Sequence, residues 1–319
     1  MLTRPDFMSK KIITIFTKDN DSLSFKNDNL IVTDKNKKIK IQVSCYKIFA
    51  VFIVGGINIT TGIIEKSKKF GFTILLFSYN FKLYESINFK MEGNTLLRKK
   101  QYLCKKQDLI SNKIIINKIE NQRDFILKLR SKDDKEIINS LNKKIEILKS
   151  NNDYDNYQIM GIEGSASKIY FKRIFDNLEW NGRQPRVKKD EINLLLDIGY
   201  TVLFNYIEAI LNIYGFDIYL GNMHRDFYKR KSLVCDMVEP FRPIIDYKIR
   251  KAYNLGQLQY SYQVIRDAYT INYKDGNKFV ILILEELINC REDIFNYIQQ
   301  YYRWIMKEDS FEKFPIVRL

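Results

Sequence analysis

The segment DEINLLLDIGYTVLFNYIEAILNIYG, residues 190 to 215, is apolar on almost every side of a helix. A helix that is hydrophobic all round must be enclosed by other elements, so we predict a central, buried helix here. Asp190 is a favourable N-cap and Gly215 a favourable C-terminal stop. The other elements should therefore be arranged around this segment.

The two parts of the chain on either side of residue 96 differ in pattern. Before it, short runs rich in β-branched residues, such as KKIITIF and NLIVT, predict strands, and NITTGIIEKSKKF predicts one helix. After it, apolar residues recur at helical spacing. We therefore predict an α+β fold with two domains: a small β-rich N-terminal domain over residues 1–92, a sandwich-like sheet with one helix, and an all-helical domain over residues 93–319.

The chain is strongly basic. It contains 53 Lys plus Arg and 38 Asp plus Glu, a formal net charge of +15. Residues 96 to 150 alone hold 15 basic and 7 acidic residues, a net of +8. This excess favours a polyanionic partner, either nucleic acid or an anionic membrane surface. An AT-rich genome, which enriches Lys, Asn and Ile, is the alternative explanation.

Apolar runs such as FAVFIVGGI and FVILILEELI are too short to span a bilayer, so nucleic acid is favoured over a membrane. The N-terminal MLTRPDFMSKKIITIF lacks the long apolar region of a secretion signal. None of the four cysteines forms a CxxC pair, which is typical of reduced thiols in a cytoplasmic protein. These cysteines are Cys45, Cys104, Cys235 and Cys290.

The segment YQIMGIEGSASKIYF, residues 157 to 171, contains Glu163 among glycine and alanine residues. Small residues let another helix approach closely, so we expect Glu163 to lie away from open water. A carboxylate in such a place is paired or binds a metal. The alternative is a glutamate on the helix surface, paired with Lys168 or Arg173.

The only histidine, His224, lies in GNMHRDFYKRKSLVCDMVEPFRP, residues 221 to 243. Asp236 and Glu239 are three residues apart among apolar neighbours, so they share a face of a predicted helix that begins near Ser232. Two prolines then break or kink this helix. His224 is either a ligand or a hydrogen-bonded structural residue.

Taken together, two carboxylates and an imidazole suit Mg²⁺ or Mn²⁺. Such an ion polarises a phosphoryl oxygen and activates an attacking hydroxyl. A carboxylate-rich metal site in a basic protein indicates phosphodiester chemistry on DNA or RNA.

These segments resemble motifs of the CRISPR-associated protein 1 family, the integrase that inserts new spacers into CRISPR arrays. GIEGSASKIYF is similar to the family's glutamate motif, and GNMHRDFYKRKSLVCDMVEPFRP to its second motif. Between them, RQPRVKKDEINLLLDIGYTVL resembles a Pro-rich loop followed by Asp, Asn and Gly-Tyr-Thr. INITTGIIEKSKKFGFTILLF and GNTLLRKKQY extend the similarity to the N-terminal half. Ser167 departs from the pattern, since many members have Ala there.

The resemblance implies that Glu163, His224 and Glu239 are catalytic metal ligands. It also implies that Asp236 orients a ligand without binding the metal itself. Arg242 and the basic residues around His224 become candidates for contacts with DNA phosphates. With the basic helices after residue 96 and the loop before residue 190, the candidate set is Arg183, Arg225, Lys231, Arg242, Lys105 and Lys113.

The resemblance also implies the reaction. The 3′-hydroxyl of a protospacer DNA end attacks a phosphodiester at the leader–repeat boundary of the array, by metal-dependent transesterification. The partners implied are double-stranded protospacer DNA, leader–repeat DNA, a second copy of this chain, and a dimer of CRISPR-associated protein 2 that bridges two such homodimers. Two alternatives remain: a structure-selective, metal-dependent DNA endonuclease without integration, and a non-catalytic DNA-binding scaffold.

We expect the charge reversals Lys105→Glu and Lys113→Glu, combined, to weaken duplex DNA binding at low salt about tenfold or more, because contacts with backbone phosphates are electrostatic. Fluorescence anisotropy of a labelled duplex at several salt concentrations measures the effect, and the salt dependence should become shallower. Unchanged binding at low salt would remove this segment from the DNA-binding surface.

Overall fold

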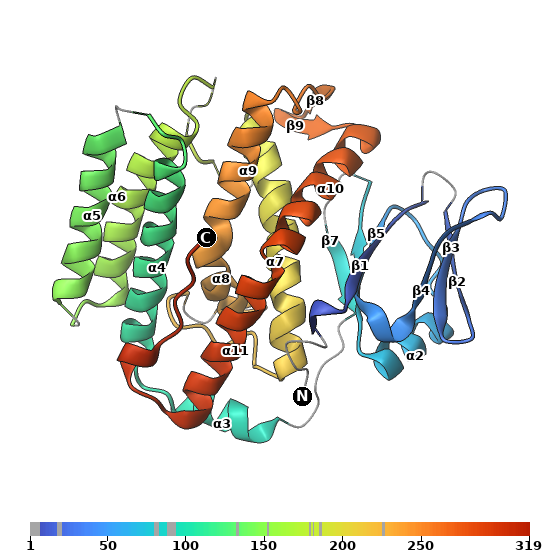
Figure 1. Ribbon diagram of the computed structural model, residues 1–319, viewed down its shortest axis with the longest axis horizontal. Helices are drawn as coiled ribbons and strands as arrows, with labels where there is room; N and C mark the ends of the chain where they lie inside the picture. The colour runs from blue at the N-terminus through green and yellow to red at the C-terminus, as the bar shows by residue number, and fades with distance from the viewer. Residues whose placement is uncertain are drawn as a thin grey trace.

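A computed structural model shows β-strands in the first part of the chain and mostly helices in the second (Figure 1). The α+β class is thus confirmed. The structure describes residues 7–17, 21–79, 83–87, 94–131, 134–151, 153–178, 180, 182–184, 187–224 and 227–319. The predicted domain boundary at residues 92 and 93 lies outside the described residues and stays a prediction.

Two sheets form the β-rich part. The inner sheet has the order β1 (Lys11–Phe16), β5 (Ile48–Val54), β6 (Thr73–Phe77) and β7 (Leu83–Ile87). Its first three strands are parallel and β7 is antiparallel. The outer sheet is an antiparallel meander of β2 (Ser22–Lys26), β3 (Asn29–Thr33) and β4 (Ile39–Ser44). The short η2 (Cys45–Lys47) precedes β5, and α2 (Thr61–Phe70) connects β5 to β6.

The inner sheet is covered on both faces. Phe52 and Val54 belong to the core shared with the helices, whereas Val51 and Ile53 belong to the core between the two sheets. Every residue of β5 is accordingly buried, which explains why its sequence is continuously apolar rather than alternating. In Figure 1 the inner sheet lies beside the helices and the outer sheet lies on its far side.

The helical part surrounds α7 (Glu191–Tyr214), which Asp190 caps and Gly215 ends, as predicted. Its side chains pack against the helices α8 to α11 and against the inner sheet. The other elements are α3 (Thr95–Leu103), α4 (Gln107–Leu127), α5 (Lys135–Ser150), α6 (Asn156–Ile174), α8 (Ser232–Val238), η4 (Glu239–Phe241), α9 (Arg242–Asn254), α10 (Tyr273–Asn289), α11 (Arg291–Lys307) and η5 (Phe311–Lys313).

One element of the second part is not helical. β8 (Tyr262–Ile265) and β9 (Ala268–Ile271) form an antiparallel hairpin, so the prediction of an all-helical C-terminal domain is wrong at this point. Arg266 and Asp267 form its turn with positive φ values of 51° and 59°. Such turns are usually signalled by Asn-Gly or Asp-Gly, and this sequence has neither at the turn.

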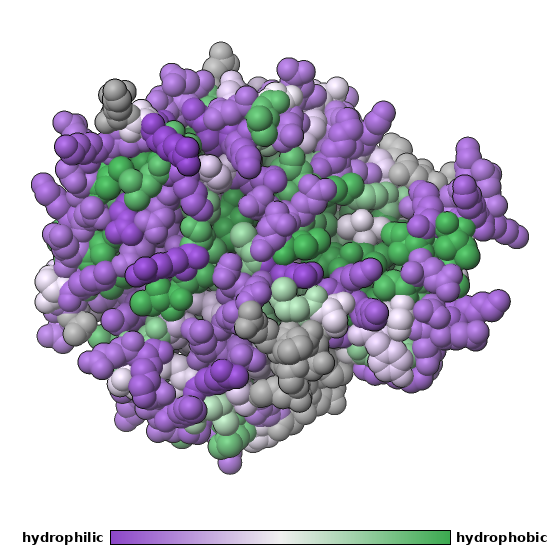
Figure 2. Space-filling view, viewed as in Figure 1, coloured by the Kyte–Doolittle hydropathy of each residue, from purple (hydrophilic) through white to green (hydrophobic). Residues whose placement is uncertain are grey.

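Helix α7 is the one described helix that is long and apolar enough to cross a membrane, and 83% of its most apolar window is buried inside the fold. Its composition is therefore explained by its central position. Hydrophilic side chains cover most of the face of the molecule seen in Figure 2, and hydrophobic ones form smaller patches between them.

Aromatic contacts join the inner sheet to the helices. Phe49 of β5 lies 5.3 Å from Tyr206 of α7 between ring centroids, and Phe7 stacks on Phe295 of α11 at 4.4 Å. The β-rich and helical parts thus share one core.

We expect Phe49→Ala to lower the free energy of unfolding by about 3–5 kcal/mol, because it removes a buried ring from this shared core. Urea unfolding followed by circular dichroism and by tryptophan fluorescence should show one coincident transition in both the wild type and the variant. Two separate transitions would mean that the β-rich part and the helical part unfold independently.

Candidate active site

Glu163 lies in the middle of α6, which begins with a capping box formed by Asp155 and Gln158. Helix α4 packs against α6, and Ala166 is fully buried, but Gly161 and Gly164 face open space: a Cβ added at either would meet nothing within 4 Å. The Glu163 side chain is nevertheless only 22% exposed. Its partner is neither Lys168 nor Arg173 but a lysine of α4.

That lysine, Lys118, contacts two carboxylates. Its Nζ lies 2.5 Å from Oε1 of Glu163 and 2.7 Å from Oε2 of Glu239, and its side chain is 8% exposed. Burial alone disfavours a charged ammonium, but Glu239 and Glu163 outweigh this cost and raise the pKa of Lys118 above its ordinary value. Sequence reasoning missed Lys118, although a lysine between Ile114, Ile115 and Ile119 on an apolar helix face was a usable signal.

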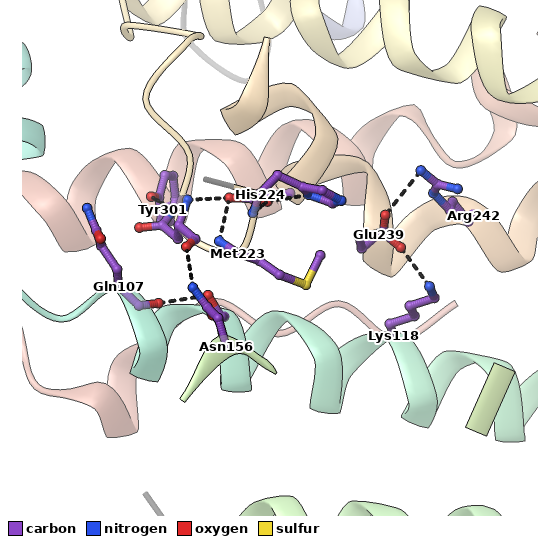
Figure 3. A network of polar contacts seen from close by, with 11 residues as sticks. Gln107, Lys118, Asn156, Met223, His224, Glu239, Arg242 and Tyr301 are labelled. Carbon is purple, nitrogen blue, oxygen red and sulfur yellow. Dashed lines mark hydrogen bonds and ion pairs between the residues drawn. The ribbon is translucent and has the colours of Figure 1, made fainter. Parts of the chain in front are cut away.

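Glu239 is the first residue of η4, directly after α8, where Pro240 prevents the helix from continuing regularly. Its Oε1 lies 3.1 Å from Nη2 of Arg242. Burial by itself would raise the pKa of Glu239, but Arg242 and Lys118 outweigh it and lower the pKa to about 2. Figure 3 shows Glu239 between these two cations, with His224 beside it.

Asp236 of α8 holds the segment that carries His224. Its fully buried carboxylate accepts hydrogen bonds from the backbone N–H groups of Asn222, Met223 and His224. The same carboxylate lies 2.8 Å from Nδ1 of His224. A carboxylate on Nδ1 fixes the ring and leaves Nε2 as the ligand nitrogen, as in many metal sites.

The three predicted metal ligands lie in the same region, but they do not surround one common cation position. Glu163 and Glu239 share the Lys118 ammonium, and His224 is near enough to contribute to the low pKa of Glu239. Within the described residues, no three His, Cys, Asp or Glu side chains surround a common cation position. Carboxylate oxygens and an imidazole nitrogen suit Mg²⁺ or Mn²⁺. Glu163 and Glu239 already share one cation, the Lys118 ammonium. The residues therefore fit a divalent ion if that ammonium moves away.

A cleft of about 690 Å³ opens beside these residues, and Lys118 and Glu163 form part of its wall. Both cationic and aromatic side chains line it, a composition that suits a nucleic-acid strand with charged phosphates and stacking bases. The cationic residues are Lys118, Lys168, Lys172, Arg183 and Arg242, and the aromatic ones are Phe171, Phe175, Trp180 and Tyr200.

The model of the family described as CRISPR associated protein Cas1 matches residues 14–285 of the chain. A CRISPR-associated endonuclease Cas1 of Thermodesulfovibrio yellowstonii is 31% identical over 278 residues, which cover 81% of this chain and 86% of the relative. The chain belongs to the Cas1 family. The family predicted from the motifs is thus confirmed, and such relatives are named as endonucleases.

Two solved structures share the Cas1 fold of this chain. A chain of a Cas6-RT-Cas1–Cas2 complex matches with a TM-score of 0.80 and 19% identity, over 97% of this chain and 36% of that chain. A casposase bound to integration product matches with a TM-score of 0.77 and 18% identity, over 94% and 92% of the two chains. At these identities the likeness concerns the fold.

The candidate DNA-binding residues of this Cas1 protein differ in their freedom to bind phosphate. Both oxygens of the buried Glu208 contact Nζ of Lys231, at 2.8 and 2.9 Å. Arg183 is paired with Asp197 at 2.6 Å. These two cations therefore have partners within the protein already.

The other described candidates differ in exposure and pairing. Lys105 is exposed in the connection between α3 and α4, and Lys113 is half-buried on α4. Arg242 contacts Glu239 with one nitrogen, while its guanidinium carbon lies 4.9 Å from the centroid of the Tyr200 ring. Arg225 lies outside the described residues.

A second buried carboxylate, Asp246 of α9, forms part of the cleft wall. The Tyr200 hydroxyl donates a hydrogen bond to it. Burial is the largest cause that raises the pKa of Asp246 to about 7, against the opposing effect of Tyr200, Lys118 and Arg242. Neither Asp246 nor Tyr200 was singled out from the sequence.

We expect Asp246→Asn to change how stability depends on pH. Because the folded pKa is raised, the folded state binds a proton that the unfolded state releases between about pH 4 and pH 7, so the carboxylate destabilises the wild type increasingly over that window. The stability of the variant relative to the wild type should rise by on the order of 3 kcal/mol from pH 4 to pH 8. Chemical denaturation at several pH values measures it, and a constant difference would contradict the raised pKa.

Proposed function

We propose that this Cas1 protein is the metal-dependent DNA integrase of CRISPR adaptation. It joins the 3′-hydroxyl ends of protospacer DNA to the leader–repeat boundary of the array by transesterification. One observation carries the proposal: Glu163 and Glu239 share the Lys118 ammonium, His224 is near enough to lower the pKa of Glu239, and Glu163 and Lys118 line a cleft with cationic and aromatic side chains. The matching fold of a casposase bound to integration product supports it.

Glu163, Glu239 and Nε2 of His224 would hold Mg²⁺ or Mn²⁺. The bound ion would polarise the scissile phosphodiester and activate the attacking hydroxyl. Arg242 supplies fixed positive charge beside this position, and pre-organised charge of this kind stabilises the charge that develops on a reacting phosphate.

Other parts of the chain position these groups. Asp236 keeps the His224 ring in one orientation through four contacts with the loop. Trp180, with Phe171 and Phe175 at 5.6 and 5.1 Å between ring centroids, forms an aromatic group in the cleft wall that suits unpaired bases near a strand end.

The proposed partners are double-stranded protospacer DNA, leader–repeat DNA, a second copy of the chain and Cas2, in the cytoplasm of a prokaryote. The matching chain from a Cas6-RT-Cas1–Cas2 complex supports the assembly with Cas2. Hydrolysis by the same residues, with water as the nucleophile, is the second candidate function, and the names of endonuclease relatives favour it.

A strand-transfer assay tests the proposal. A fluorescent protospacer duplex is incubated with a plasmid carrying the leader and repeat, Cas2, and Mg²⁺ or Mn²⁺. We expect label in the plasmid with the wild type, and a loss of at least about 100-fold in Glu163→Gln and His224→Ala, because both remove a direct ligand. Glu286→Gln is the matched control, since it removes a carboxylate paired with Lys248 away from the cleft.

Shortened strands without joining, dependent on both residues, would reduce the function to that of an endonuclease. Activity that survives both substitutions, or that persists in EDTA, would show that the proposed metal site is wrong.

A further inference from the structure

The ammonium of Lys118 lies where two acidic groups from distant parts of the chain meet. Glu163 is 45 residues away in the sequence and Glu239 is 121 residues away. A buried lysine is costly unless it is paired, and here one ammonium serves two carboxylates on different elements.

The attachment of α4 to its neighbours does not depend on this ammonium alone. Nδ2 of Asn121 donates to the carbonyl of Pro240 at 2.9 Å, which joins α4 to η4. The side chain of Asn117 binds both the N–H and the C=O of Val317. Neutral amides thus already connect α4 to η4 and to the C-terminal segment.

Charge balance disfavours a divalent ion and the Lys118 ammonium at these two carboxylates together. Glu163 and Glu239 carry two negative charges, and Lys118 and Arg242 carry two positive charges. Adding a divalent ion to this balanced, largely buried group gives an excess of two positive charges, and departure of the lysine lowers that excess to one. Lys118 lines the cleft, and its side chain is a flexible four-carbon chain. A change of side-chain torsion angles can therefore move the ammonium away from the carboxylates and into the cleft.

We propose that Lys118 is a built-in competitor for the metal position. Its ammonium holds Glu163 and Glu239 together in the metal-free protein. It turns into the cleft, toward a phosphate of the nucleic acid, when a divalent ion takes the carboxylates. The inference rests on the proposed function, because it requires that these carboxylates bind a metal.

Ser167 provides an internal control. Its Oγ donates to the same Oε1 of Glu163 at 2.6 Å, and it accepts a hydrogen bond from Nε2 of Gln122 at 3.3 Å. Ser167→Ala therefore removes a neutral donor from the oxygen that Lys118 contacts and leaves the ammonium in place. If any loss of a donor to Glu163 changed metal affinity, this variant would show it.

The experiment measures the affinity of Mn²⁺ for the nucleic-acid-free protein, from the electron paramagnetic resonance signal of unbound Mn²⁺. We expect Lys118→Met to bind Mn²⁺ about tenfold more tightly or better, a change of the size that alterations around metal ligands produce. Its melting temperature should be lower than that of the wild type without metal and should rise more on adding Mn²⁺. Lys118→Arg, which keeps the charge, should bind as weakly as the wild type.

Two controls should stay within about twofold of the wild type, well below the effects of altering groups that support a metal site. They are Ser167→Ala and Lys248→Met, which removes a comparable ion pair with Glu286 outside the cleft. If Lys118→Met does not fold without metal, Lys118→Gln replaces it, because its amide can still donate to one carboxylate.

The outcomes distinguish the competitor role of Lys118 from the proposed metal site itself. Equal or weaker Mn²⁺ binding in Lys118→Met and Lys118→Gln, with clear binding in the wild type, would overturn the competitor role and leave the proposed metal site standing. Absence of Mn²⁺ binding in the wild type and in every Lys118 variant would instead overturn the metal site, and the competitor role with it.

Discussion

Helix α7 must be enclosed on every side, and this constraint arranges the rest of the molecule. Its apolar surface is covered by the inner sheet through Phe49 and Tyr206, and by the helices α8 to α11. Burial of this much apolar surface is the main source of stability in a chain of this size. The chain that leaves α7 after Gly215 leads to His224, and α8 and η4 then carry Asp236 and Glu239. The His224, Asp236 and Glu239 part of the candidate site thus follows α7 in the chain, whereas Lys118 and Glu163 come from α4 and α6.

Electrostatic pairing then decides what each charged residue can do. Lys118, Arg242, Glu163 and Glu239 balance one another beside the cleft. The Asp236 carboxylate instead contacts backbone N–H groups and the His224 ring. The same rule limits the basic surface. Lys231 and Arg183 are neutralised by carboxylates of the protein itself, so net charge overstates the positive surface that DNA can meet.

Membership in the Cas1 family and the geometry of the cleft are independent observations, and both support a site that acts on nucleic acid. The family rests on a match over most of the chain, and the cleft rests on positions of side chains. What the geometry adds is the contacts of three further groups: Lys118 pairs with both carboxylates, Ser167 donates a hydrogen bond to Glu163, and Asp246 accepts one from Tyr200. Each of them acts on a motif residue or on the wall of the cleft.

The sequence by itself determined the α+β class, the strands, and the buried helix with its two caps, because these depend on local periodicity and on residues such as Asp190 and Gly215. It also supplied the family, through motifs around Glu163 and His224. Only the tertiary structure decided the partner of Glu163, since Lys118 is 45 residues away and no local pattern connects them. The same holds for the β8–β9 hairpin, whose turn lacks glycine, and for the cleft, whose walls come from α4, α6, α7, α9 and the segment after α6. Pairing of buried charges is a long-range property, and a chain specifies it only after its elements have packed.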